Sequence, residues 1–197
     1  MKPTLQRLLE LQRLLLDFSN VERVLHRRRS DQLQMENDTE HSYDLAMTAW
    51  YLAKWFPNLD KDKIIKFALV HDFVEVHAGD TFTYGSPKDI ASKEQREAEA
   101  LKKLQEDWSD FSDLTKEIIE YESLKGSEAK FVYALDKLMP IMMIYIHDGY
   151  SWKEHGITAK MLYDKKKEKV AKSPEIYPYF VELHDLLMSH PEIIKAK

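Results

Sequence analysis

The most informative residues of this chain are an adjacent imidazole and carboxylate, His71 and Asp72, within an otherwise apolar segment. Residues 66–80 read KFALVHDFVEVHAGD, and the apolar spacing before His71 predicts a core-facing helix. Buried polar groups are costly unless they are hydrogen-bonded or bind a metal ion. The pair therefore predicts a divalent metal site, because imidazole and carboxylate together suit such an ion.

Two further residues can complete the coordination of this ion. His41 lies in Glu40-His41-Ser42, and Asp136 lies in Ala134-Leu135-Asp136-Lys137. Both segments have helical periodicity, so the ligands can converge from neighbouring helices of a bundle. Two imidazoles and two carboxylates suit one Mn, Co, Ni, Fe or Zn ion, and the ligand types do not choose among these metals. Each residue alone has a purely structural interpretation, and it is their combination that predicts the metal.

Glu75 is the candidate for proton transfer beside the metal. It follows Asp72 by three residues and His71 by four, and on a helix both separations put it on the same face as the pair. We expect it to act as a general acid/base or to orient water, without binding the metal itself. His77 lies about 120° away from the face of His71 on such a helix and is not expected to be a ligand.

Composition limits the class of protein. The 197 residues include no Cys, which excludes disulfides, thiolate metal sites and a Cys nucleophile. The formal charge of −5 argues against a nucleic-acid polymer as partner, and no apolar run is long enough to span a bilayer. Residues 1–13 have no uninterrupted apolar stretch typical of a secretion signal. We expect a cytoplasmic protein without a membrane partner.

The periodicity predicts an all-α protein, since only 5 Gly and 7 Pro leave little turn chemistry. A polar loop is expected at 27–39 and another loop at 80–86, and the lysine run 165–167 is expected on a solvated helix face. The expected helices span about residues 5–16, 21–25, 41–56, 64–78, 88–108, 113–123, 127–147, 158–171 and 174–189.

The motifs resemble those of the HD-domain metal-dependent phosphohydrolases, and most closely the 5′-deoxynucleotidase branch. Residues 36–42 (ENDTEHS) are similar to its first ligand segment, and residues 71–80 (HDFVEVHAGD) to its H-D-x-x-E-x-x-x-G-D signature. Residues 127–137 (SEAKFVYALDK) look like its last ligand helix. We expect one HD-domain helical bundle over 1–197, with a metal-site core at about 36–149 and extra C-terminal helices at about 151–197.

This resemblance implies a homodimeric enzyme that hydrolyses a nucleoside 5′-monophosphate or a similar small anionic phosphoester. The reaction would be attack of metal-activated water on phosphorus. The metal ligands that the resemblance implies are His41, His71, Asp72 and Asp136. It implies Glu75 and Asp80 as the catalytic acids.

The motifs define the residues that contact the substrate less well than they define the metal ligands. The 5′-deoxynucleotidase branch carries an Arg-Trp pair upstream of its first His, which helps to read the sugar. The corresponding stretch here is His26-Arg27-Arg28-Arg29-Ser30, and the first Trp is Trp50. Arg28 and Arg29 either bind phosphate, as guanidinium groups do in bidentate fashion, or form a solvated patch.

Basic residues after the 80–86 loop are the other candidates for contact with phosphate. Lys88, Lys93 and Arg96 either offset charge on the phosphoryl oxygens or are exposed charges of a helix.

Other members of the same fold fit the motifs less well. A di-iron oxygenase needs further histidines between Asp72 and Asp136, where His77 stands alone. An alarmone hydrolase carries a Glu-Asp pair, whereas Glu75 is followed by Val76. A non-catalytic nucleotide-binding or sensor protein would be expected to lack a ligand or Glu75. A hydrolase of a di- or triphosphorylated or specialised metabolite stays open.

Overall fold

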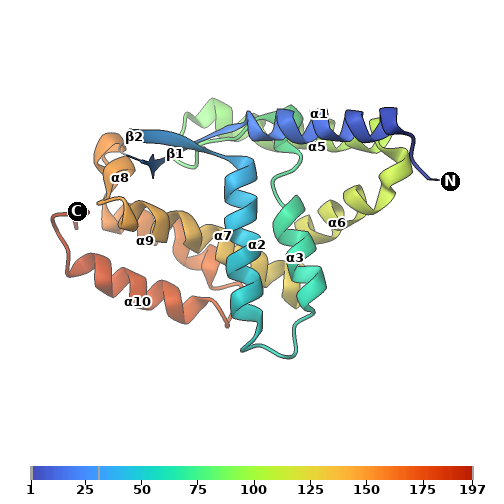
Figure 1. Ribbon diagram of the computed structural model, residues 1–197. Helices are drawn as coiled ribbons and strands as arrows, with labels where there is room; N and C mark the ends of the chain where they lie inside the picture. Colours follow the sequence, from blue (N-terminus) through green and yellow to red (C-terminus); the bar gives the residue numbers. More distant parts are fainter. Residues whose placement is uncertain (1, 31, 197) are drawn as a thin grey trace.

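The computed structural model describes residues 2–30 and 32–196, and for Arg29 the backbone only. The chain forms a bundle of helices with one two-stranded hairpin between the first two helices of the sequence (Figure 1), which confirms the all-α class. No described helix combines the length and the apolar character needed to cross a membrane. In chain order the elements are α1 (Leu5–Ser19), β1 (Glu22–Arg29), β2 (Gln32–Asn37), α2 (Asp38–Ala53), α3 (Lys61–Val70), α4 (Glu75–Ala78), α5 (Pro87–Asp107), the 3₁₀ turn η1 (Ser109–Phe111), α6 (Ser112–Glu122), α7 (Ser127–Ile146), α8 (Tyr150–His155), α9 (Ala159–Val170) and α10 (Tyr177–Met188).

The hairpin corrects two expectations from the sequence. Residues 21–25 were expected as a short helix and residues 27–39 as a loop, but β1 and β2 pair as antiparallel strands. The register joins His26 to Met35 and Arg28 to Leu33, with an irregularity between Glu22 and His26. Short apolar runs do not distinguish helix from strand by periodicity alone. Cross-strand pairing, which is a non-local interaction, decided the conformation here.

The helix around His71 is also interrupted, whereas the sequence predicted one helix to Ala78. Helix α3 ends at Val70, and residues 71–74 form turns before the short α4. Two backbone bonds close these turns, from the amide of Phe73 to the carbonyl of Val70 at 3.0 Å and from that of Glu75 to Asp72 at 2.8 Å. Such i→i+3 bonds tighten the chain at a helix end. His71 and Asp72 therefore lie at the end of α3 and not within a continuous helix.

Two hydrophobic clusters meet at this interruption. The larger cluster joins α2, α3 and α7 to the C-terminal helices, with Leu45, Phe67 and Phe131 at 1% exposure or less. The smaller one packs α1 against α5 and α6 through side chains such as Phe18 and Leu104. The chain passes from the first cluster to the second between Phe67 and Phe73. The His71-Asp72 pair is thus fixed between two packed regions, where side-chain movement is costly.

The C-terminal helices pack on the bundle beside α7 (Figure 1). Trp152, Leu162 and Phe180 are each at most 3% exposed and belong to the larger cluster. The periodicity did not predict a separate helix at 150–155, where the structure has α8. The last described residues return to the bundle, since the amide of Ala159 donates to the carbonyl of Lys195 at 2.8 Å.

The returning chain passes so close to Gly149 that no side chain fits there. We therefore predict that Gly149→Ala destabilises the fold. Its φ is +70°, and a Cβ there would overlap the carbonyl oxygen of Ile193. Gly156 is the matched control, because its φ is +63° but a Cβ would meet nothing within 4 Å. We expect Gly156→Ala to cost about 1 kcal/mol and Gly149→Ala at least about 2 kcal/mol more, measured by chemical denaturation. Equal losses for the two variants would contradict the close approach of Ile193.

Candidate metal centre

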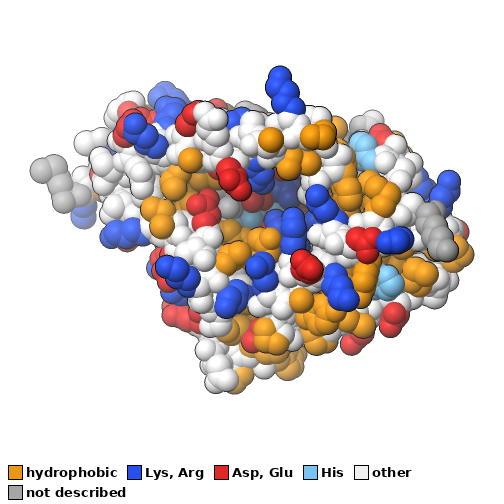
Figure 2. Space-filling model, turned by 180° about the vertical axis from the view of Figure 1, so that it is seen from behind, with side chains coloured by type: hydrophobic (Ala, Val, Ile, Leu, Met, Phe, Trp, Pro, Cys, Tyr) orange, Lys and Arg blue, Asp and Glu red, His pale blue; other side chains and the backbone are white. Residues whose placement is uncertain are grey.

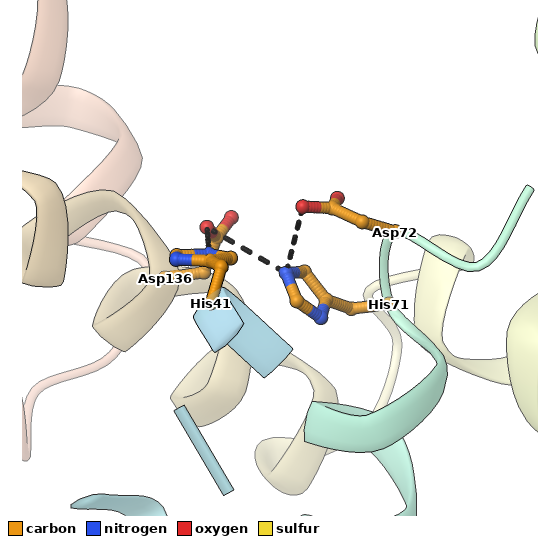
Figure 3. Close-up of side chains that lie close together, drawn as sticks. All are labelled: His41, His71, Asp72 and Asp136. Atoms are coloured by element: carbon orange, nitrogen blue, oxygen red, sulfur yellow. Dashed lines mark hydrogen bonds and ion pairs between the residues drawn. The ribbon is translucent and has the colours of Figure 1, made fainter. Parts of the chain in front are cut away.

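Four side chains from three helices converge on one point (Figure 3). His41 comes from the first turns of α2, His71 and Asp72 from the end of α3, and Asp136 from the middle of α7. One donor atom from each lies within 4.8 Å of all the others. His41 Nε2 is 3.0 Å from Asp136 Oδ1, and His71 Nε2 is 2.9 Å from Asp72 Oδ2. The set could hold a metal ion, and it contains the four residues that the sequence predicted as ligands.

Local capping interactions determine where two of these residues lie. Asn37 accepts a hydrogen bond from the amide of Glu40, and the Glu40 carboxylate accepts one from the amide of Asn37. This capping box fixes the first turn of α2 and so the position of His41. Asp60 caps α3 by accepting hydrogen bonds from the amides of two residues in its first turn.

The orientation of His71 fits the binding of a cation. Its Nδ1 lies 2.9 Å from the carbonyl oxygen of Ala68. A carbonyl can only accept, so Nδ1 carries the proton and the lone pair of the neutral ring is on Nε2. This Nε2 is buried without a well-formed hydrogen bond and points towards Asp72 and Asp136. A lone pair that faces carboxylate oxygens is unfavourable unless a cation lies between them.

His41 has an outer carboxylate partner, as metal-binding histidines commonly do. Its Nδ1 is 3.5 Å from Glu36 Oε2, and both side chains are 2% exposed. Burial and the neighbouring Arg23 lower the pKa of His41, but hydrogen bonds with Asp136 and Glu36 outweigh them, and the net pKa is raised. In the neutral ring, which binds a metal ion through Nε2, Nδ1 would carry the proton and face Glu36.

A second group of carboxylates adjoins the first through Asp72. Asp38, Asp72 and Glu75 each have an oxygen within 4.8 Å of the other two. Burial, with repulsion from Asp72, raises the pKa of Glu75 to about 11 and that of Asp38 to about 6. Glu75 Oε2 is buried and has no hydrogen-bond partner among the described residues. Glu75 therefore lies beside the four ligands, as the spacing predicted, although a turn and not a continuous helix brings it there.

Arg23 is the functional residue that the sequence analysis missed. Its guanidinium lies 2.7 Å from Asp72 Oδ2, 3.0 Å from Asp38 Oδ1 and 3.3 Å from Glu36 Oε2. Side chains alternate along a strand, so Arg23 shares the inward face of β1 with Leu25, which is 5% exposed. The period-two pattern of β1 would have indicated this face, but the segment was interpreted as a helix.

The basic residues predicted to contact the substrate differ in position. Arg28 and Lys88 are exposed and line neither of the two cavities that reach the cluster, and the side chain of Arg29 lies outside the described residues. Lys93 lines the cavity that contains His71 and Asp72, with its Nζ 3.6 Å from Glu75 Oε1.

Two cavities reach the cluster, and Lys137 lines both. One contains His71, Asp72 and Lys93. The other contains Arg23, Asp80 and Asp136, together with aromatic side chains. Figure 2 shows a hollow in the face opposite that of Figure 1, with Lys and Arg side chains gathered around it.

The loop that carries Asp80 is held by Arg96, one of the candidates for contact with phosphate. Arg96 donates to the carbonyl oxygen of Ala78 and, at 2.7 Å, to Oγ1 of Thr81. These bonds tie the loop to α5 on both sides of Asp80. In this arrangement the guanidinium of Arg96 is engaged with the protein and positions the loop.

Known proteins resemble this chain over its motifs and over its fold. Human 5′-deoxynucleotidase HDDC2 is 35% identical over 114 residues, which are 54% of this chain and 52% of the human protein. The chain thus spans about half the length of the mammalian relatives it matches. The 5′-deoxynucleotidase HDDC2 of Dictyostelium discoideum is 32% identical over 148 residues, which are 68% of this chain and 75% of that protein.

A solved structure and a family model extend the match to most of the chain. The crystal structure of a predicted metal-dependent phosphohydrolase from Magnetospirillum magnetotacticum superimposes with a TM-score of 0.78 at 27% identity. The superposition covers 95% of this chain and 98% of the other. The family model described as HD domain matches residues 20–177, which include β1, the whole ligand set and the start of α10. Together with the converging His and Asp side chains, this match shows that the chain belongs to the HD domain family.

Proposed function

We propose that this chain is a metal-dependent phosphohydrolase of a small anionic phosphoester, in the first instance a nucleoside 5′-monophosphate. The observation that carries the proposal is the convergence of two imidazoles and two carboxylates beside basic cavities. The names of the relatives, 5′-deoxynucleotidase and metal-dependent phosphohydrolase, support the same reaction class.

The proposed cofactor is one divalent transition metal ion (Mn, Co, Ni, Fe or Zn). His41, His71, Asp72 and Asp136 would hold it, and the unpartnered Nε2 of His71 supports this assignment. A divalent ion in this place lowers the pKa of water and polarises a phosphoryl oxygen. The ligand types do not distinguish among these metals, because the affinities of such sites follow a common order.

The surrounding residues have distinct roles in the proposed reaction. A divalent cation bound beside Glu75 would favour its ionised form. Oε2, the oxygen that lacks a partner among the described residues, would then orient the attacking water and take up its proton. Asp80, which lines the cavity beside Asp136, would assist as a second acid. The ammonium groups of Lys93 and Lys137 would offset negative charge on the phosphoryl oxygens, and Arg23 would keep Asp72 ionised and oriented.

We predict that Asp72→Ala abolishes both metal binding and turnover, because it removes one of four ligands. The measurement is metal content by elemental analysis and phosphate release from ribo- and deoxyribonucleoside mono-, di- and triphosphates, with Mn, Co, Ni, Zn or Mg added singly. Asp113→Ala is the control, since the Asp113 side chain is 79% exposed. A wild-type protein that binds metal stoichiometrically but releases no phosphate from any compound would contradict the proposed reaction.

We predict that Glu75→Gln keeps the metal and loses turnover by at least about 100-fold, the usual contribution of a general acid/base. Glu97→Gln is the matched control, because Glu97 also pairs with Lys93, at 3.2 Å, but lies outside the two carboxylate groups. The kcat of both variants would be measured at saturating metal. Activity of Glu75→Gln within about threefold of the wild type would remove Glu75 from the reaction.

We also propose a homodimer, formed through one side of α2. Tyr43, Met47, Trp50 and Tyr51 lie three or four residues apart, on one side of the helix, and are 44–66% exposed. Contiguous apolar surface of this kind is typical of an interface between proteins.

The expected mass in light scattering is twice the 23.3 kDa of the chain, and Trp50→Glu should reduce it to that of the monomer. Met161→Glu changes an exposed apolar residue of α9, 44% exposed, and should leave the mass unchanged. A monomeric wild type would refute the dimer without affecting the proposed reaction.

Several expectations from the sequence remain predictions. These are a single HD domain over 1–197, a cytoplasmic location and the absence of nucleic-acid and membrane partners. The packing of α8–α10 into the larger hydrophobic cluster supports the first of them.

A further inference from the structure

Lys166 occupies a core position of a helix that otherwise presents its lysines to solvent. The buried residues of α9 are Ala159, Leu162, Lys166 and Val170, a spacing of three and four residues that defines one helix face. Lys166 is 8% exposed, whereas its neighbours Lys165 and Lys167 are exposed. The lysine run was expected on a solvated face, and this is wrong for its middle residue.

The buried ammonium of Lys166 has no protein partner in the described part of the chain. Among residues 2–30 and 32–196, no hydrogen bond or ion pair joins it to another group, although the residue is buried. A charge in this position is costly without a counter-ion. Burial, aided by repulsion from Lys137, accordingly lowers the pKa of Lys166 to about 7. The side chain is therefore placed where an anion from outside the protein would be stabilising.

The cavity that Lys166 lines is one of the two that reach the candidate metal centre. Lys137 and Arg23 also line it, together with the proposed ligand Asp136. Arg23 already pairs with carboxylates, at 2.7 Å from Asp72 and 3.0 Å from Asp38, and Lys137 pairs with Asp136 at 2.5 Å. Lys166 differs from these two cations because its full hydrogen-bonding capacity is available to a ligand.

Apolar and aromatic side chains from the same C-terminal helices close this cavity. Trp152 of α8 and Leu162 of α9 line it, together with Phe82 and Tyr84 of the loop after Asp80. A lysine in a cavity lined by both charged and aromatic side chains, beside a metal centre, suits the phosphate of a phosphomonoester whose organic part lies among the aromatic rings. Lys137 and Lys166 together would then face one dianionic phosphoryl group.

We propose that Lys166 is a substrate-binding residue, which donates hydrogen bonds from Nζ to a non-reacting oxygen of the substrate's phosphoryl group. This inference rests on the proposed function, because it assigns the phosphate site of that reaction. It also gives α9 a direct part in substrate recognition, beyond its packing against α7.

The test measures binding of inorganic phosphate to the metal-loaded protein by calorimetry and by thermal unfolding. Lys166→Met should weaken phosphate binding by at least about tenfold, as expected for the loss of a charged hydrogen bond, with metal content unchanged. Without phosphate, its Tm should equal or exceed that of the wild type, because an apolar side chain replaces a buried unpaired charge. The stabilisation by phosphate should be reduced in the same variant.

Two further variants separate charge from packing. Lys165→Met removes an exposed lysine from the same helix and should bind phosphate as the wild type does. Lys166→Arg retains the charge and should recover most of the affinity. In turnover of the preferred substrate, Lys166→Met should raise KM more than it lowers kcat.

Two results would overturn the inference: phosphate affinity of Lys166→Met equal to that of the wild type, or loss of the metal in this variant. The measurements distinguish failure of this inference from failure of the proposed reaction. A wild type that binds phosphate through Lys166 but hydrolyses no nucleotide refutes the reaction and leaves the binding site. If the wild type hydrolyses a nucleotide and Lys166→Met binds phosphate as the wild type does, the proposed reaction stands and the role of Lys166 is refuted.

Discussion

The main constraint on this structure is the concentration of negative charge in its interior, which the surrounding elements have to compensate. Five carboxylates adjoin one another around the two central imidazoles, and four of them are at most 2% exposed. They are Glu36, Asp38, Asp72, Glu75 and Asp136. Uncompensated buried charges are strongly destabilising, so the elements around them have to supply cations or protons. The raised pKa of Glu75 reflects its burial and this repulsion. Asp72, despite its burial, has a pKa well below its usual value, and the adjacent Arg23 guanidinium stabilises its ionised form.

Different parts of the chain supply the compensating charges. Arg23 comes from the hairpin, Lys93 from α5 and Lys137 from α7, next to the proposed ligand Asp136. A divalent ion would complete the balance at the point where the four ligand atoms converge. The hairpin therefore has a role beyond connecting α1 to α2, because it carries a guanidinium to the buried carboxylates.

The C-terminal helices complete the surroundings of the site. They contribute Trp152 and Leu162 to the larger hydrophobic cluster and also to the cavity beside Asp136. Stability and substrate recognition are thus linked in α9, where Lys166 lies on the apolar face and lines the cavity. The motif residues lie around the start of α2, in the turns and short α4 after α3, and in α7, so part of the cavity wall comes from a region of the chain with no recognisable motif.

Local periodicity and residue types were sufficient to predict the helical class, the convergence of the four proposed ligands and the position of Glu75 beside them. They were sufficient because His71 and Asp72 lie within an apolar run, where a polar pair is tolerated only if it is bonded or binds an ion. Tertiary structure decided the hairpin, the interruption after Val70, and the positions of Arg23 and Lys166. A strand of the length of β1 is stabilised by its partner across the hairpin, so its own residues did not distinguish it from a helix. The burial of Lys166 depends on how α9 packs against α7. The residues of either helix alone do not determine how two helices distant in the chain pack together.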